Sequence, residues 1–280
     1  VNESQPNFNW FKAWYPVVPV EILNPDEPHK FQLLGVDVVV WKDAQMDSNP
    51  DFGPKPKKGK RTGGTWRAFV DECPHRKVPL SEGRIENDGT LLCSYHAWRF
   101  NGDGDLVDAP QLDRDEPSLN RIKSNPKSKC NSFPTEVVDG VLYIWPEAGE
   151  DAKIESALKP VNSYKIKGAE EDRMWYGPWN YRELPYGADY FIENVVDSAH
   201  VQVSHHNIVG SRYSDQRMHM KTVKEVTKDG FAIENSFPDR NDTSLTSYHA
   251  PNLVAIETSY GNGARQTLEL HVSPSRPGFW

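Results

Sequence analysis

The sequence predicts an α+β protein of two domains, the first of them entirely β. Two stretches, 31–43 and 65–73, combine β-branched and aromatic residues with the alternation of strands, and 137–147 holds a strand pair around an Asp-Gly turn. A Trp- and Tyr-rich segment further on leads into one convincing helical pattern, followed by more strand-like stretches. We therefore expect an all-β domain over residues 1–147 and a second, mixed domain over 148–280.

The elements between these landmarks follow from local composition. Residues 44–64 are rich in Pro, Gly and Lys, which predicts a long loop or the tip of an inserted hairpin. The helical pattern covers 188–202, and 229–237 and 252–261 have the residue types of strands. The last stretch, 267–280, alternates like a strand and stops without a turn or polar tail, so we expect the native chain to continue past it.

Charge and cysteine content exclude several classes of protein. The 280 residues carry 32 Lys plus Arg against 40 Asp plus Glu, a net charge of −8, which argues against a general binder of nucleic acid or anionic membranes. The 3 cysteines do not make a disulfide framework, which favours a reducing compartment and leaves Cys130 as a bystander thiol. No apolar run reaches the roughly 18 residues that a membrane-spanning helix needs.

Two cysteines and two histidines form the most distinctive pattern in the chain. Cys73 and His75 are separated by one residue, Cys93 and His96 by two, and seventeen residues lie between the pairs. Structural zinc sites space paired ligands by two to four residues, so the first step is atypical of zinc. A Rieske-type [2Fe–2S] cluster takes two thiolates on one iron and two imidazoles on the other, which two Cys/His loops can supply. The alternative is an ordinary set of buried Cys and exposed His residues.

Neighbouring residues would support such a cluster. Pro74 stiffens the first loop, and Ser94 and Tyr95 can offer hydroxyl groups to the cluster or to a cysteine sulfur.

A second pattern lies on the predicted helix. Its polar residues recur at spacings of three and four, which puts them on one face, opposite an apolar face. They are Asp189, Glu193, Asn194, Asp197 and His200. His200 and His205 are five residues apart, too far for adjacent turns of a straight helix unless it ends or bulges near 201–203. Two such histidines with a carboxylate could bind a mononuclear Fe(II) and leave positions for O₂. The alternative is a helix with surface histidines.

These motifs resemble those of the Rieske non-haem iron oxygenases. The matching segments are CPHRKVPLSEG, from residue 73, and CSYHAWRFNGDGD, from residue 93, together with the later Asp197, His200, His205 spacing. The sequences of these segments are most similar to those of the chlorophyll-related branch of the family. This branch includes pheophorbide a oxygenase, chlorophyllide a oxygenase and the translocon-associated Rieske proteins. The chain departs from the usual pattern at Ala97, where the family commonly has Gly, and at Lys77 and Val78.

The resemblance implies roles for individual residues and a helix-grip-like catalytic domain. It assigns the cluster to the two Cys/His pairs, the iron to His200 and His205, and the link between iron and cluster to Asp197. His206 ranks behind His205 because the family spacing selects His205. The third iron ligand of the family is an Asp far downstream, and Asp239, Asp242 and Glu257 stand in contexts that do not match it. We therefore expect this ligand beyond Trp280 in the native protein.

The resemblance also implies an activity and partners. The expected reaction oxygenates a chlorophyll-derived tetrapyrrole or another large apolar ring, with O₂ and electrons from a ferredoxin. A head-to-tail homotrimer would bring His96 of one subunit to Asp197 of the next. The expected location is the chloroplast, at the envelope or thylakoid, or the cytoplasm if the source is bacterial, with a possible membrane anchor outside this chain. The basic run 55–61 could steer an acidic ferredoxin, or be a solvated loop tip.

Two other readings are open. The enzyme could act on a sterol, a quaternary amine or a small aromatic compound. Alternatively, the protein could be a non-catalytic Rieske electron carrier, which a missing third iron ligand would permit.

Overall fold

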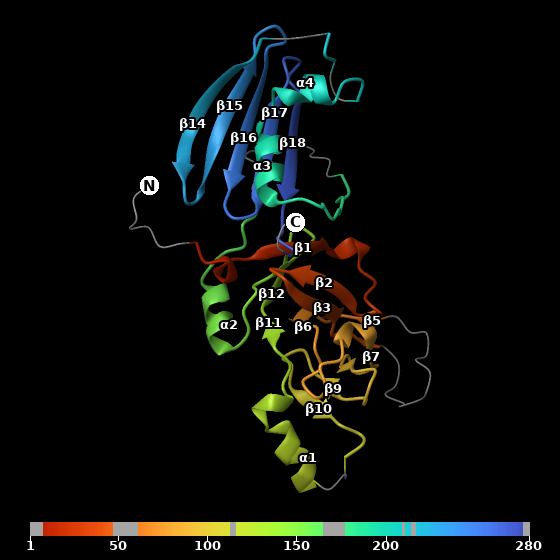
Figure 1. Ribbon diagram of the computed structural model, residues 1–280. Helices are drawn as coiled ribbons and strands as arrows, with labels where there is room; N and C mark the ends of the chain where they lie inside the picture. The colour runs from red at the N-terminus through yellow and green to blue at the C-terminus, as the bar shows by residue number, and fades with distance from the viewer. Residues whose placement is uncertain are drawn as a thin grey trace. The chain divides into compact units, whose positions relative to one another are not determined.

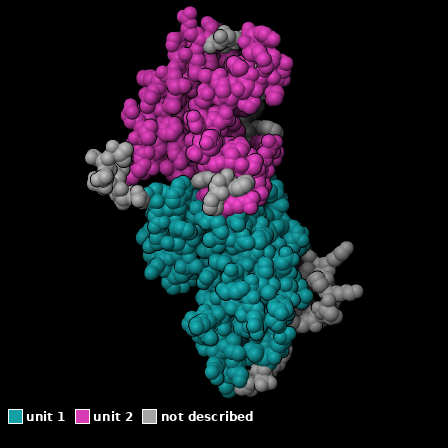
Figure 2. Space-filling model, viewed as in Figure 1, with its two compact units in different colours: residues 1–161 teal, residues 162–280 magenta. Residues whose placement is uncertain are grey.

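The computed structural model (Figure 1) describes residues 8–46, 61–112, 116–164, 177–208, 211–213 and 217–276. The chain divides into two compact units, residues 1–161 and 162–280, which Figure 2 distinguishes by colour. This division falls later than the boundary we expected after residue 147. The reason is that helix α2 (Glu150–Ala157) is tied to the first unit, where Trp14 Nε1 donates to the carbonyl oxygens of Ser156, in the helix, at 3.3 Å and of Lys159, just after it, at 2.9 Å.

In its described residues, the first unit contains three antiparallel sheets and a two-stranded ribbon. The first sheet has the order β1 (Tyr15–Pro19), β13 (Val141–Ile144), β12 (Thr135–Val138). The second has the order β11 (Ser132–Phe133), β6 (Trp66–Val70), β3 (Val36–Lys42), β2 (His29–Leu33). The third has the order β10 (Leu106–Asp108), β9 (Arg99–Phe100), β8 (Leu91–Leu92), β7 (Arg84–Ile85). The ribbon pairs β4 (Gln45–Met46) with β5 (Arg61–Thr62).

Short helices precede or connect these strands, so the first domain is not entirely β as we predicted. They are η1 (Trp10–Lys12), η2 (Val20–Ile22), η3 (Leu80–Glu82), α1 (Glu116–Lys123) and η4 (Pro126–Ser128).

Strand β3 explains why the first unit has two cores. Val38 and Val40 face one buried cluster, with strands β1 and β13, while Val39 and Trp41 face the other, which contains both motif cysteines. Successive side chains of a strand point to opposite faces, so a strand buried on both faces needs apolar residues at every position. The run VVVW in the sequence therefore marks a central strand.

Two hairpin turns determine the register of the strands around them. Asp139 and Gly140, at φ 50° and 79°, connect β12 to β13 as the Asp-Gly pair predicted. Leu34 and Gly35, at φ 51° and 80°, form the same kind of turn inside the segment 31–43. The segment 31–43, whose residue types predicted strand structure, thus holds two strands, and the turn between them was not predicted because a left-handed Leu is an uncommon turn residue.

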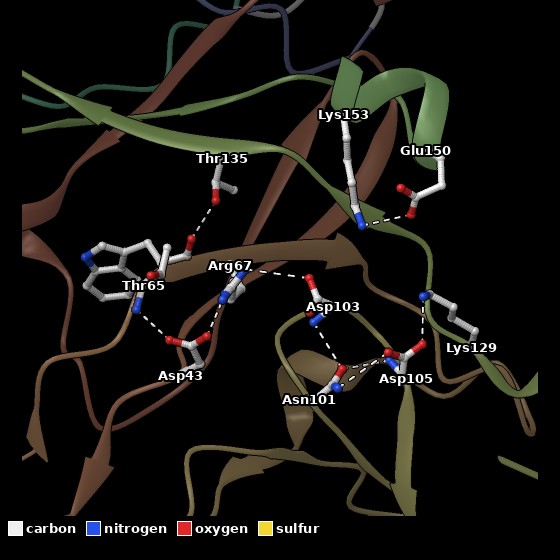
Figure 3. A network of polar contacts seen from close by, with 11 residues as sticks. Asp43, Thr65, Arg67, Asn101, Asp103, Asp105, Lys129, Thr135, Glu150 and Lys153 are labelled. Atoms are coloured by element: carbon white, nitrogen blue, oxygen red, sulfur yellow. Dashed lines mark hydrogen bonds and ion pairs between the residues drawn. The ribbon is translucent and has the colours of Figure 1, made fainter. Parts of the chain in front are cut away.

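A polar network fastens the third sheet to the second (Figure 3). Arg67, on β6, donates from Nε to Asp43 Oδ2 at 2.6 Å, and its Nη1 lies 4.0 Å from Asp103 Oδ1. Asp103 belongs to the β9–β10 turn, in which Asn101 Oδ1 accepts the backbone N–H groups of Asp103 and Asp105 at 3.1 and 2.9 Å. The turn of the small sheet that carries the second Cys/His pair is thus linked to the second sheet by an ion pair, whose arginine is held in place by a charged hydrogen bond to Asp43.

The second unit is built on a five-stranded antiparallel sheet with helices. The strand order is β14 (His219–Thr227), β15 (Gly230–Phe237), β16 (Asp242–His249), β17 (Leu253–Ser259), β18 (Arg265–His271). Strands β15 and β17 lie where 229–237 and 252–261 predicted strands. Two helices precede the sheet, α3 (Ala188–Val196) and α4 (His200–Ser204). No helix among the described residues is both long and apolar enough to cross a membrane.

The single helix expected over 188–202 is interrupted. Asp197 has φ −83° and ψ 91°, an extended conformation that ends α3, and its Oδ1 accepts the backbone N–H of Ala199 at 2.9 Å. Asp side chains compete for backbone N–H groups in this way, which favours helix ends over helix interiors. The break lies at 197–199 and not near 201–203, so the predicted polar face does not continue from α3 to His200.

Candidate cluster and iron sites

The two Cys/His loops have the same backbone design. The N–H of Cys73 donates to the carbonyl of Val78 at 2.8 Å, and the carbonyl of Cys73 accepts from Lys77 at 2.8 Å. The second loop repeats both bonds, with Cys93 N–H donating to Trp98 at 2.9 Å and Ala97 N–H donating to Cys93 at 3.1 Å. Each loop is thus closed by two backbone hydrogen bonds between its cysteine and residues four and five positions later.

A left-handed residue makes both closures possible. Lys77 and Ala97, each four residues after the cysteine, have φ 60° and 55°. Glycine adopts this conformation without strain, which gives a physical reason for the Gly that the family commonly has at the position of Ala97.

The thiol groups of Cys73 and Cys93 meet in the core. Their residues are 2 % and 1 % exposed, and the two thiols share a hydrogen bond. That hydrogen bond, with the backbone N–H groups of Tyr95 and His96, lowers the pKa of Cys93 to about 6. The pKa of Cys73 is raised, first by the same hydrogen bond and then by burial. The loop therefore stabilises a thiolate, the form that binds metal.

The two imidazoles lie side by side at the surface. The ring centroids of His75 and His96 are 4.6 Å apart, His75 is exposed and His96 is half-buried. The pKa of His75 is lowered, first by partial desolvation and then by the neighbouring His96 and Arg76. A lowered pKa favours the neutral ring that can bind a metal.

The four side chains form a thiol pair and an imidazole pair. No three His, Cys, Asp or Glu residues gather as ligands of a single ion in the described part of the chain. A tetrahedral zinc ion would need all four around one point, whereas a Rieske cluster takes two thiolates on one iron and two imidazoles on the other. The donor set fits the [2Fe–2S] cluster.

In the second unit, the break after α3 brings two histidines together. The ring centroids of His200 and His205 lie 5.3 Å apart. His200 Nδ1 contacts the carbonyl oxygen of Asp197 and lies 3.8 Å from its Oδ2. With Nδ1 so engaged, Nε2 is the nitrogen that His200 can offer to a metal. His206 is occupied differently, since its Nδ1 accepts the backbone N–H of Arg212 at 3.2 Å and its ring meets Tyr213.

The carboxylates considered as a third ligand have other surroundings. Asp242 accepts the backbone N–H of Gly261 at 2.9 Å and lies 3.4 Å from Arg240 Nε. Glu257 accepts a hydrogen bond from the Tyr164 hydroxyl, and Asp239 is exposed. The described residues thus supply two imidazoles that fit a mononuclear iron, and no carboxylate joins them.

Comparison with known proteins identifies the first unit. Residues 13–134 match the Rieske [2Fe–2S] domain family. This segment is a Rieske domain. Rice (Oryza sativa subsp. japonica) pheophorbide a oxygenase is 34 % identical over 258 residues, which are 92 % of this chain and 44 % of that protein. The protochlorophyllide-dependent translocon component 52 of Arabidopsis thaliana is 33 % identical, over 72 % of this chain and 32 % of that protein. The chain thus spans less than half the length of these relatives.

Solved structures extend the likeness to the fold of both units. A crystal structure of dicamba monooxygenase bound to dicamba has a TM-score of 0.66, with 18 % identity, over 97 % of this chain and 75 % of that one. At this identity the match shows similarity of fold alone, and that fold agrees with the predicted α+β class.

The Rieske domain contains supporting residues that the sequence pattern did not reveal. The indole of Trp98 stacks on His75, with centroids 4.6 Å apart and planes 7° from parallel. Asp71, with a side chain that is 0 % exposed, accepts from Ser81 N at 2.7 Å and Ser81 Oγ at 2.6 Å, which closes the base of the first loop. The only hint in the sequence was that all three residues lie within or beside the motif.

Tyr95 differs from its expected role. Its side chain is largely exposed, at 61 %, and its ring lies against His96, while the backbone N–H groups of the loop reach the Cys93 sulfur. The same surface opens into a hollow of ≈ 290 Å³ lined by Arg84, Gln111, Tyr95 and His96, among others. His96 is therefore accessible to a partner.

The basic run 55–61 lies outside the described residues except for Arg61. Arg61 is not a surface cation: its side chain is 4 % exposed, its Nη1 donates to the carbonyl of Ala44 at 2.9 Å, and its Nε lies 3.0 Å from Asp26 Oδ1. Including Arg61 in a ferredoxin-steering patch was wrong, because its guanidinium is buried and bonded to groups of this chain and is not presented to a partner.

Proposed function

We propose that this chain is the catalytic part of a Rieske non-haem iron oxygenase that acts on a chlorophyll-derived tetrapyrrole. The observation that carries the proposal is the coexistence of two sites in one chain: the thiol and imidazole pairs of the Rieske domain, and His200 and His205 beside Asp197 in the second unit. The tetrapyrrole substrate is supported by the similarity to pheophorbide a oxygenase and to a protochlorophyllide-dependent protein. The chloroplastic names of those relatives support a chloroplast location.

Each site residue has a distinct task in this proposal. Cys73, Cys93, His75 and His96 hold the cluster, and His200 and His205 hold the iron. When bound, the cluster supplies electrons one at a time and the iron binds and activates O₂. The backbone N–H groups around Cys93 stabilise its negative charge, and the Asp197 carbonyl orients the His200 ring.

We further propose that electrons come from a ferredoxin and pass between subunits of a homotrimer, from His96 of one copy to Asp197 of the next. Two observations support an intermolecular route. His96 lines an open hollow, and the Asp197 side chain is 52 % exposed, so each can be reached by a partner. Head-to-tail contacts of this kind close into rings.

A non-catalytic electron carrier is the second candidate. It is favoured by the fact that no carboxylate joins His200 and His205 within the described residues. Iron content separates the two, since the oxygenase should load about three irons per chain and the carrier about two.

The decisive experiment combines metal analysis with turnover. Reconstituted protein, ferredoxin, its reductase and ¹⁸O₂ would be incubated with pheophorbide a, chlorophyllide a or protochlorophyllide, and with a sterol for comparison. We expect ¹⁸O in a tetrapyrrole product. Oxygenation of the sterol alone, or about two irons per chain and no product, would refute the proposal.

A further inference from the structure

The turn between α3 and α4 carries Asp197 and leads to His200, so its position determines where both side chains lie. The bonds that shape this turn are local: Ala199 N–H donates to Asp197 Oδ1 at 2.9 Å, and His200 Nδ1 contacts the Asp197 carbonyl. Bonds that span two or three residues set the shape of the turn. They do not fix it against the rest of the unit.

One side chain of the sheet makes that longer connection. Asn235, on β15, is 0 % exposed, and its Nδ2 donates to the hydroxyl oxygen of Ser198 at 3.0 Å, across 37 residues of sequence. Ser198 is the central residue of the turn 197–199. The amide thus joins an interior strand of the sheet to the residue between Asp197 and Ala199.

The surroundings of Asn235 make a polar side chain at this position unfavourable for the stability of the fold. Among the described residues, its Oδ1 has no hydrogen-bond partner, and neither has Oγ1 of Thr246, a residue that is also 0 % exposed. Asn235 pairs with Ser244, and Thr246 with Ile233, so Thr246 occupies the diagonal position on the next strand of the same face. A buried polar group without a partner destabilises a fold, and an apolar side chain of the same size would fit here without that cost.

We propose that Asn235 is a positioning residue for the iron site, which holds the turn 197–199 on the sheet through Ser198. In this role the Nδ2–Ser198 bond fixes Asp197 and His200 in space, while the unpaired Oδ1 is tolerated. The inference rests on the proposed function in one respect, namely that His200 and His205 hold an iron. The contact between sheet and turn does not depend on it.

Asn235→Leu and Ser198→Ala test the proposal, with Thr246→Val as the matched control on the same face. Asn235→Leu removes a hydrogen bond and an unpaired acceptor together, so the melting temperature should stay close to that of the unmodified protein. Amide hydrogen exchange over 197–205 should become about tenfold faster, and the affinity for Fe(II) should fall about tenfold to hundredfold, as for residues that orient metal ligands. Exchange on β15 should not change.

Ser198→Ala should reproduce these changes, and the double variant should be no worse than either single one, because both remove the same bond. Thr246→Val should change neither exchange nor iron affinity. The proposal is overturned if Asn235→Leu and Ser198→Ala both keep normal hydrogen exchange over 197–205 and normal Fe(II) affinity. It is also overturned if Thr246→Val changes these two quantities as much as those variants do. Ser198→Ala keeps the test valid should Asn235→Leu fail to fold. Hydrogen exchange needs no turnover, so a protein that oxygenates no tetrapyrrole would refute the proposed function and leave this result standing.

Discussion

Replacing Ala97 with glycine should stabilise the Rieske domain. Ala97 has φ 55°, in the left-handed region, at the position that closes the second Cys/His loop on Cys93. This conformation costs an L-residue about 1–2 kcal/mol, and glycine avoids the cost. Glycine in turn loses about 0.4–1 kcal/mol through the greater freedom of its unfolded chain. The net effect of Ala97→Gly should be about 0.5–1 kcal/mol in favour of the folded domain.

Thermal unfolding of the cluster-loaded protein would measure this effect. In a unit of this size about 1 kcal/mol corresponds to about 2–4 °C, so the melting temperature should rise by about 1–4 °C. The visible absorbance of the cluster and the far-ultraviolet circular dichroism report the transition.

For three control variants we can predict whether the melting temperature rises or falls. Lys77→Gly, at φ 60° in the first loop, should also stabilise, because the ion pair that it loses to Glu72 is solvent-exposed and worth little. Gly104→Ala should destabilise, since φ is 85° and the new Cβ would lie 2.5 Å from the carbonyl oxygen of Cys130. Ala68→Gly, in the buried part of β6, should destabilise as well. If Ala97→Gly lowered the melting temperature as Ala68→Gly does, the argument from backbone strain would be refuted.

The remaining predictions concern the ligands and the link between the two sites. His75→Ala and His96→Ala should each abolish the Rieske optical and EPR signature and leave the β domain folded by circular dichroism; a variant that kept the signature would show that the ligand assignment is wrong. Asp197→Asn should keep a normal cluster spectrum and iron content but lose turnover, because the carboxylate charge beside His200 Nδ1 is removed. His200→Ala should instead lose the mononuclear iron and leave the cluster reducible, so metal analysis distinguishes two equally inactive variants; an active Asp197→Asn enzyme, or full iron content after His200→Ala, would contradict these roles.

The sequence by itself determined the features that depend on residue chemistry at short range. The Cys/His spacing identified the Rieske cluster, because only certain residue types bind its irons and two loops can present them. The Asp139-Gly140 pair predicted its hairpin, because few residues adopt left-handed φ at low cost. The alternating and apolar strands likewise predicted the sheets of the first domain, but not its helix α1, so the domain is not entirely β as expected.

Tertiary structure decided what depends on contacts between distant residues. The helix expected over 188–202 breaks at Asp197, next to Ser198, whose hydroxyl accepts a hydrogen bond from Asn235 on β15. Arg61 belongs to a lysine-rich run but is buried, because carbonyl groups from elsewhere in the chain receive its guanidinium. The contact between Asn235 and Ser198 spans 37 residues. A local pattern contains no information on such pairs, because the free energy that selects them comes from burial and hydrogen bonding after the chain has folded.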